Sequence, residues 1–132
     1  MIGDPSMTPI PRPTDAELSV LRVLWSRGPS TVREVYEVLC QERDLGYTTV
    51  LKALQVMDGK GLVVRDESQR SHVFAAAFQE SETRTSLVED LLEKAFGGSA
   101  LKLLAHALHA KKPSRRELDE IQKLLDEARG RR

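Results

Sequence analysis

The sequence has one cysteine and no excess of either charge. Cys40 alone cannot form an internal disulfide or supply the paired thiolates of a structural zinc site. Its place toward the end of an expected helix, with no neighbouring histidine, predicts an inert, partly buried thiol. The 20 Lys and Arg residues balance the 20 Asp and Glu residues, so no bulk field draws the chain to nucleic acid or anionic lipid. A reducing, cytoplasmic setting fits these features.

Long hydrophobic runs are also missing. No window approaches the ~18 consecutive apolar residues of a membrane helix, and the N-terminus lacks the basic and apolar regions of a secretory signal. We therefore expect a soluble protein with no membrane partner. The first thirteen residues contain Pro5, Pro9, Pro11 and Pro13, which oppose helix and sheet, so residues 1–13 are predicted to form a flexible arm.

Signatures of catalysis are lacking as well. The sequence contains no glycine-rich phosphate loop, nucleophile elbow or HExxH helix, so we expect no enzyme, no catalytic residue and no cofactor. His106 and His109 are three residues apart and could share a metal with a carboxylate from another helix. Histidines on a charged amphipathic helix more often face solvent, and we therefore predict no metal site.

The 132 residues suffice for about one domain. Local sequence signals predict the secondary structure of its first half. Capping boxes at Thr14-Asp15-Ala16-Glu17 and Thr31-Val32-Arg33-Glu34 predict the starts of two helices. A third helix should run from about Tyr47 to Lys60, with Gly61 as its C-terminal cap. The β-favouring runs 62–65 and 71–74 then predict a hairpin. Three helices followed by a hairpin indicate a winged helix-turn-helix over residues 14–78.

Residues 79–132 carry three further amphipathic helices, the last preceded by a capping box at Ser114-Arg115-Arg116-Glu117. Their apolar stripes have too little partner surface within about fifty residues to be stable alone, and a second copy of the chain is the simplest cover. The fold class is therefore predicted as mainly α with a small β-hairpin wing and a C-terminal three-helix dimerisation region. The predicted dimerisation residues are Leu87, Leu91, Leu92, Leu101, Leu104, Leu108, Leu118, Ile121 and Leu125.

The third helix has two contrasting faces. On a helical wheel, Tyr47, Val50, Leu54 and Met57 form an apolar face that should pack on the first two helices. The opposite face could be an ordinary solvated surface, but its position before a hairpin favours a role in the major groove. Lysine, glutamine and threonine there suit phosphate, guanine, adenine and thymine contacts. The predicted DNA-binding residues of this helix are Thr48, Thr49, Lys52 and Gln55.

The hairpin adds further candidates for contact with the DNA backbone. Arg70 and His72 are predicted to bind DNA, whereas Arg65 is assigned to a solvated turn beside Asp66 and Glu67. Residues 1–76 hold nine Lys and Arg against ten Asp and Glu. Non-specific DNA affinity should therefore be modest, and specific contacts and dimerisation should make up the difference.

Several stretches together resemble the penicillinase repressor family of the BlaI, MecI and CopY type. They are Asp15-Ala16-Glu17-Leu18 with Val23-Leu24-Trp25, Tyr47-Thr48-Thr49-Val50-Leu51-Lys52 with Leu54-Gln55-Val56-Met57, Lys60-Gly61-Leu62-Val63, the hairpin from Arg65 to Phe74, and Phe96-Gly97-Gly98. The resemblance covers residues 14 to about 129. It implies a homodimeric bacterial transcriptional repressor that binds dyad-symmetric operator DNA, controlling a β-lactamase-like or sensor-protease-linked operon. The family's recognition-helix positions fall on Thr48, Thr49, Lys52 and Gln55.

The chain departs from the family pattern in two places. Several members are inactivated when a sensor-protease pathway cleaves an Asn-Phe bond in the second C-terminal helix, where this chain has His106-Ala107. A regulatory protease would thus recognise another sequence here, or release would use another mechanism. The copper-responsive branch has a cysteine-rich C-terminal motif that this chain lacks. Two alternatives to a repressor of this type are a ligand-responsive winged-helix regulator and a protein-interaction adaptor without DNA affinity.

Overall fold

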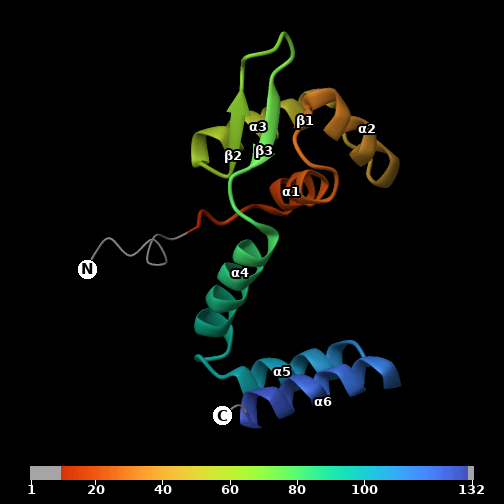
Figure 1. The fold of residues 1–132 in the computed structure, drawn as a ribbon, viewed down its shortest axis with the longest axis vertical. Helices are drawn as coiled ribbons and strands as arrows, with labels where there is room; N and C mark the ends of the chain where they lie inside the picture. The colour runs from red at the N-terminus through yellow and green to blue at the C-terminus, as the bar shows by residue number, and fades with distance from the viewer. Residues whose placement is uncertain (1–9, 131–132) are drawn as a thin grey trace, which may run out of the picture. The chain divides into compact units, whose positions relative to one another are not determined.

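The structure is a computed structural model that describes residues 10–130. The elements of this described part are α1 (Asp15–Arg27), β1 (Ser30–Thr31), α2 (Val32–Glu42), α3 (Tyr47–Lys60), β2 (Val63–Asp66), β3 (Val73–Ala76), α4 (Glu80–Ala95), α5 (Ala100–Ala110) and α6 (Arg115–Gly130) (Figure 1). Of the expected N-terminal arm, residues 1–9 lie outside the described residues. Residues 10–13 have no regular secondary structure, and the carbonyl of Arg12 accepts a hydrogen bond from Lys60 Nζ at 3.5 Å.

The predicted helix boundaries in the first half are confirmed. Thr14 Oγ1 accepts a hydrogen bond from the Glu17 amide at 3.2 Å, and Glu17 Oε1 accepts one from the Thr14 amide at 2.9 Å. The same reciprocal pair links Thr31 and Glu34 at the start of α2. Gly61 ends α3 with φ of 84°, in the left-handed region that glycine adopts without a steric penalty. These caps satisfy amides and carbonyls that a helix end otherwise leaves unpaired.

A small antiparallel sheet packs beside the first three helices. Strands β2 and β3 form the predicted hairpin, with Arg65 opposite Phe74, although each strand begins one or two residues later than the sequence indicated. The third strand, β1, was not predicted. It pairs Ser30 with Phe74 and Thr31 with Val73, so the sheet order is β1-β3-β2. A two-residue strand has no alternation pattern of its own and forms only because β3 offers a free edge.

The hydrophobic core lies among α1, α2, α3 and the sheet. Helix α3 contributes Val50, Leu54 and Met57, each no more than 1% exposed. The other core residues are Val20, Leu21, Val23, Leu24, Val35, Leu39, Leu62, Val63 and Phe74. At the edge of this core, the Trp25 indole N–H donates a hydrogen bond to the carbonyl of Phe78 at 3.0 Å, which ties α1 to the segment after β3.

Two residues do not lie where the sequence indicated. Tyr47 was placed on the buried face of α3, but it is 41% exposed, because it stands at the margin of the apolar arc in the first turn of the helix. Cys40 was expected to be partly buried and is exposed. Its neighbour Leu39 takes the inward position near the end of α2, so the thiol side of the helix faces outward.

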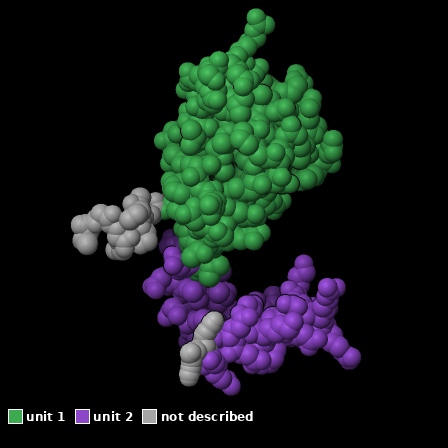
Figure 2. Space-filling model, in the orientation of Figure 1, with its two compact units in different colours: residues 1–88 green, residues 89–132 purple. Residues whose placement is uncertain are grey.

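The chain divides into two compact units, residues 1–88 and 89–132, coloured separately in Figure 2. The first unit contains the winged helix and the start of α4, where Thr83 is 1% exposed. In the second unit, no residue of α5 or α6 is buried. Within residues 10–130, no helix combines the length and apolar character needed to cross a membrane.

Candidate nucleic-acid interface

Helix α3 presents a polar face because its apolar face is fixed in the core. Burial of Val50, Leu54 and Met57 sets the rotation of the helix about its axis. The side chains on the opposite side are then directed to solvent. All four of the helix residues predicted to bind DNA, Thr48, Thr49, Lys52 and Gln55, are exposed.

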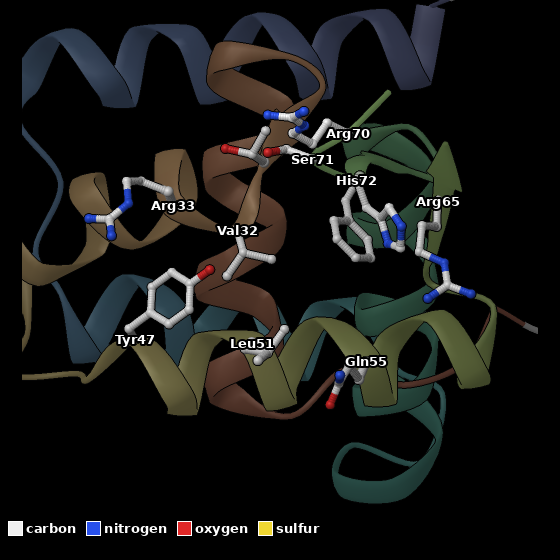
Figure 3. Close-up of a pocket in the computed structure, with 11 residues that line it drawn as sticks. Val32, Arg33, Tyr47, Leu51, Gln55, Arg65, Arg70, Ser71 and His72 are labelled. Atoms are coloured by element: carbon white, nitrogen blue, oxygen red, sulfur yellow. The ribbon is translucent and has the colours of Figure 1, made fainter. Parts of the chain in front are cut away.

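A groove of about 360 Å³ lies beside this face, between the start of α2, one side of α3 and the hairpin. Figure 3 shows Tyr47, Leu51 and Gln55 along the α3 side, with Arg65 and His72 of the hairpin near Gln55 and Arg33 of α2 near Tyr47. The complete lining is Thr31, Val32, Arg33, Tyr47, Leu51, Gln55, Arg65, Arg70, Ser71, His72 and Phe74.

The groove has a positive lining although the chain as a whole is neutral. Three arginines and one histidine line it, and no aspartate or glutamate does. Arg65 is compensated, because its guanidinium lies 2.7 Å from Glu67 Oε2 and 3.6 Å from Asp58 Oδ2. The charges of Arg33 and Arg70 therefore dominate the lining. The folded chain thus has a local excess of positive charge on this surface, although its net charge is zero.

The six residues predicted to bind DNA occupy two adjoining parts of this surface. Gln55, Arg70 and His72 line the groove together, although the hairpin residues are at least fifteen positions from Gln55 in sequence. Thr48, Thr49 and Lys52 do not line it and lie on the neighbouring exposed face of α3.

Two groove residues, Arg33 and Tyr47, were not predicted to line a binding surface. Arg33 follows a capping residue and carries no motif of its own, while Tyr47 was assigned to the core. The one available signal was the wheel position of Tyr47 at the edge of the apolar arc, on the same side as Leu51 and Gln55.

The turn of the hairpin is shaped by an acidic residue. The amide of Ser68 donates a hydrogen bond to Asp66 Oδ1 at 2.9 Å. This backbone hydrogen bond, with a second from the Ser68 side chain, lowers the pKa of the Asp66 carboxyl below its usual value. Asp66 therefore keeps its negative charge in the turn of the wing.

The far end of α3 is anchored by a charged pair outside the groove. Lys60 Nζ lies 2.7 Å from Glu17 Oε1, and the Glu17 side chain is 6% exposed. Burial alone would raise the pKa of Glu17, but hydrogen bonds from Lys60 and Thr14 and the Lys60 charge outweigh it, so the pKa is lowered. Glu17 is thus held ionised at neutral pH, with its charge compensated by Lys60.

The predicted dimerisation residues remain largely uncovered within a single chain. Leu91, Leu118 and Leu125 are each 46% exposed, and Leu101 is 77% exposed. The other predicted residues, Leu87, Leu92, Leu104, Leu108 and Ile121, are half-buried. Val88 and Leu124 lie on the same predicted apolar stripes but were not among the predicted dimerisation residues, and both are also exposed.

The two histidines that could share a metal, His106 and His109, lie on α5. No group of three His, Cys, Asp or Glu side chains within residues 10–130 is placed to hold an ion. His106 packs against Phe96, with ring centroids 5.4 Å apart, and its Nδ1 lies 3.1 Å from the carbonyl of Lys102. The His106-Ala107 pair lies inside the regular helix α5, with both residues exposed.

Comparisons with known proteins find relatives among transcriptional repressors. The sequence profile of the penicillinase repressor family matches residues 13–127. A transcriptional regulator BlaI of Mycobacterium tuberculosis (strain CDC 1551 / Oshkosh) is 39% identical over 102 residues, which cover 76% of this chain and 74% of the relative. The penicillinase repressor of Bacillus licheniformis is 24% identical over 126 residues, covering 96% and 98% of the two chains. These relatives are regulators and repressors, as expected for a chain that is not an enzyme.

Two solved structures share the winged-helix part of the fold. They are the solution structure of the DNA-binding domain of the repressor BlaI and that of monomeric Bacillus licheniformis BlaI in complex with the blaP half-operator. Each has a TM-score of 0.51 and 28% identity, covering 58% of this chain and 93% of the matched chain. The winged-helix fold class predicted from the sequence is confirmed. On the extent of the profile match and the identity to the mycobacterial regulator, the chain belongs to the penicillinase repressor family.

Proposed function

We propose that this chain represses transcription as a homodimer bound to a dyad-symmetric DNA operator. The observation that carries the proposal is the solvent-facing polar side of α3 beside a positive groove free of carboxylates. In each half-site, α3 enters the major groove with Thr48, Thr49, Lys52 and Gln55 toward the bases and phosphates. Arg70 and His72 of the hairpin meet the adjoining backbone. The BlaI structure in complex with the blaP half-operator supports this use of the fold.

Dimerisation through residues 79–132 completes the proposal. An isolated chain leaves Leu101, Leu118 and Leu125 substantially exposed, and no residue of α5 or α6 is buried. Exposed leucines of this kind on two neighbouring helices favour an interaction site. An obligate homodimer interface of ~2,000 Å² or more would cover it. Two linked winged helices would then bind two half-sites with much higher affinity than one, because the second binding step is intramolecular.

Family membership supports a target operon of the β-lactamase or sensor-protease type, with a regulatory protease as a partner. A cut between residues 99 and 110 would divide the dimerisation region and weaken DNA binding steeply. Mass spectrometry of the protein from induced cells distinguishes the release mechanisms. A fragment ending within residues 99–110 supports proteolysis, whereas an intact chain during full derepression rules it out.

Binding to the DNA upstream of the chain's own gene tests the proposed function. We expect the full-length protein to retain this fragment in a gel-shift assay in the presence of excess shuffled duplex of the same composition. Equal competition by the shuffled duplex would contradict a sequence-specific repressor and favour the protein-interaction adaptor. A matched control is Lys123→Ala, which removes one positive charge from the exposed side of α6 and should leave the shift unchanged.

A further inference from the structure

We propose that Arg33, stacked on the ring of Tyr47, binds a phosphate of the operator backbone at the end of the groove formed by the first turns of α2 and α3. The inference rests on the proposed function and adds a second backbone contact to each half-site. It concerns residues outside the recognition face of α3 and outside the hairpin. Arg33 lies in the first turn of α2, and Tyr47 is the first residue of α3.

One guanidinium and two aromatic rings pack against one another in a row at this end of the groove. The Arg33 guanidinium carbon lies 5.6 Å from the centroid of the Tyr47 ring. The Tyr47 ring in turn meets Tyr36 edge to face, with centroids 5.7 Å apart and an interplanar angle of 72°. Tyr36 is half-buried against the core, so the Tyr47 ring has a fixed support on one side and a cation on the other.

The guanidinium of Arg33 lies over the Tyr47 ring. Among residues 10–130, no carboxylate forms an ion pair with it. Stacking restricts the side chain and leaves the N–H donors at the edge of the guanidinium plane available. An arginine in this state loses less rotamer entropy on binding a phosphate, and it can donate two parallel hydrogen bonds.

Comparing Arg33 with Arg65 indicates that Arg33 binds an external anion. Arg65 lines the same groove, but it forms ion pairs with Asp58 and Glu67, which neutralise its charge within the protein. Arg33 and Arg70 lie at different parts of a lining that contains no acid. Two cations without a carboxylate partner, at separate points of one groove beside the recognition helix, match the regular negative charge of a nucleic-acid backbone.

The test measures affinity of the full-length protein for the upstream operator duplex at several salt concentrations. We expect Arg33→Gln to weaken binding at least several-fold. It should lower the magnitude of the log–log salt slope by about one for each half-site, since one phosphate contact per subunit is lost. Arg22→Gln is the matched control, because Arg22 is an exposed arginine of α1 outside the groove. It should leave the slope unchanged.

Two variants of Tyr47 separate the stacking role from a merely structural one. Tyr47→Phe keeps the ring and should bind as the wild type does, whereas Tyr47→Ala should weaken binding. Combining Tyr47→Ala with Arg33→Gln should cost little beyond Arg33→Gln alone, because the two residues act as one contact. Thermal unfolding of each variant verifies that the winged helix is intact.

The outcomes are distinguishable from failure of the proposed function. If Lys52→Ala weakens operator binding but folded Arg33→Gln matches Arg22→Gln in affinity and slope, the inference is wrong and the repressor role stands. A Tyr47→Phe variant as weak as Tyr47→Ala would also overturn the stacking role. If the wild-type chain shows no preference for the operator duplex, the proposed function itself fails.

Discussion

Lys60 Nζ contacts Glu17 Oε1 at 2.7 Å and joins the last turn of α3 to the first turn of α1. Glu17 also accepts a hydrogen bond from the Thr14 amide in the capping box of α1. One carboxylate therefore both caps the start of α1 and connects α1 to α3. The pair lies at the opposite end of α3 from Tyr47. It therefore fixes the C-terminal end of the helix whose exposed face is proposed to read DNA.

Breaking this pair should destabilise the winged helix. Lys60→Met leaves the Glu17 charge in a largely buried position, with the Thr14 hydrogen bonds as partial compensation. Because Lys60 is one-third exposed, we expect a loss of about 1–2 kcal/mol in the free energy of unfolding, less than for a fully buried pair. Urea unfolding followed by the fluorescence of Trp25, the single tryptophan, measures it.

The control for this prediction is Arg84→Met. Arg84 pairs with Glu80 at 2.7 Å, but its side chain is 72% exposed, so its removal should change stability by no more than about 0.5 kcal/mol. Equal effects of Lys60→Met and Arg84→Met would contradict a structural role for the buried pair.

The Glu17 pair should also make stability depend on pH in a defined direction. The pKa of Glu17 is lower in the folded chain than the ordinary value of 4.5. Its contribution is therefore fully present above about pH 4.5 and is lost as pH falls through the folded pKa. Glu17→Gln keeps a side chain able to cap α1 and should be less stable than the wild type at pH 7.

The difference between these two proteins should shrink as pH is lowered below about 4.5, as the wild-type carboxyl becomes protonated. Urea midpoints measured from pH 7 to the acid limit of folding test this trend. Comparison with the variant cancels the contribution of Glu34, whose pKa is also lowered, chiefly by the hydrogen bond that its carboxylate accepts from the Thr31 amide. A difference that stays constant or grows in acid would refute the assigned sign.

Local signals explain why much of the fold is predictable. Capping at Thr14 and Thr31 involves partners three residues away, and Gly61 needs only its own backbone conformation. The short strand β1 depends on an edge presented by residues more than forty positions later, so no local pattern marks it. The orientation of Tyr47 depends similarly on its contact with Tyr36.

The site shows the same division between local and distant information. The exposed face of α3 follows from helical periodicity, because Val50, Leu54 and Met57 fix the buried side. The groove cannot be predicted from helical periodicity, because it depends on Arg33 of α2 and Arg70 of the hairpin coming together beside α3. Charge counting over the whole winged helix conceals this segregation, because acids such as Asp58 and Glu67 are placed against Arg65.

A charge on the apolar side of α5 should prevent dimerisation without unfolding the subunit. Leu101 is 77% exposed in the single chain, so Leu101→Glu should cost the isolated subunit little. In a dimer the same carboxylate would be buried without a partner, which is strongly unfavourable. We expect sedimentation equilibrium to show a dimer for the wild type and a monomer for the variant.

Lys102→Glu is the neighbouring control, at an exposed polar position of the same helix. It should remain dimeric. A wild-type protein that sediments as a monomer at micromolar concentration would contradict the predicted interface, as would a dimer unaffected by Leu101→Glu.

Lys52 and Gln55 should affect DNA binding in different ways. If Lys52 contacts a phosphate, Lys52→Ala should weaken binding to all sequences and reduce the salt slope by about one per half-site. Gln55→Ala should relax discrimination at one base pair of each half-site, by about 1–3 kcal/mol. Affinities for a set of single-base operator variants measure both effects. Folded variants with wild-type affinity and specificity would exclude these two residues from the interface.

A footprint titration of the full-length protein on the DNA upstream of its own gene tests the central claim most directly. A dimeric repressor predicts two protected half-sites related by a dyad, with centres separated by about one helical turn or a multiple of it. Both should fill over the same protein concentrations, because the second winged helix binds intramolecularly. Protection of a single half-site, independent filling of the two, or uniform protection without sequence preference would contradict the account.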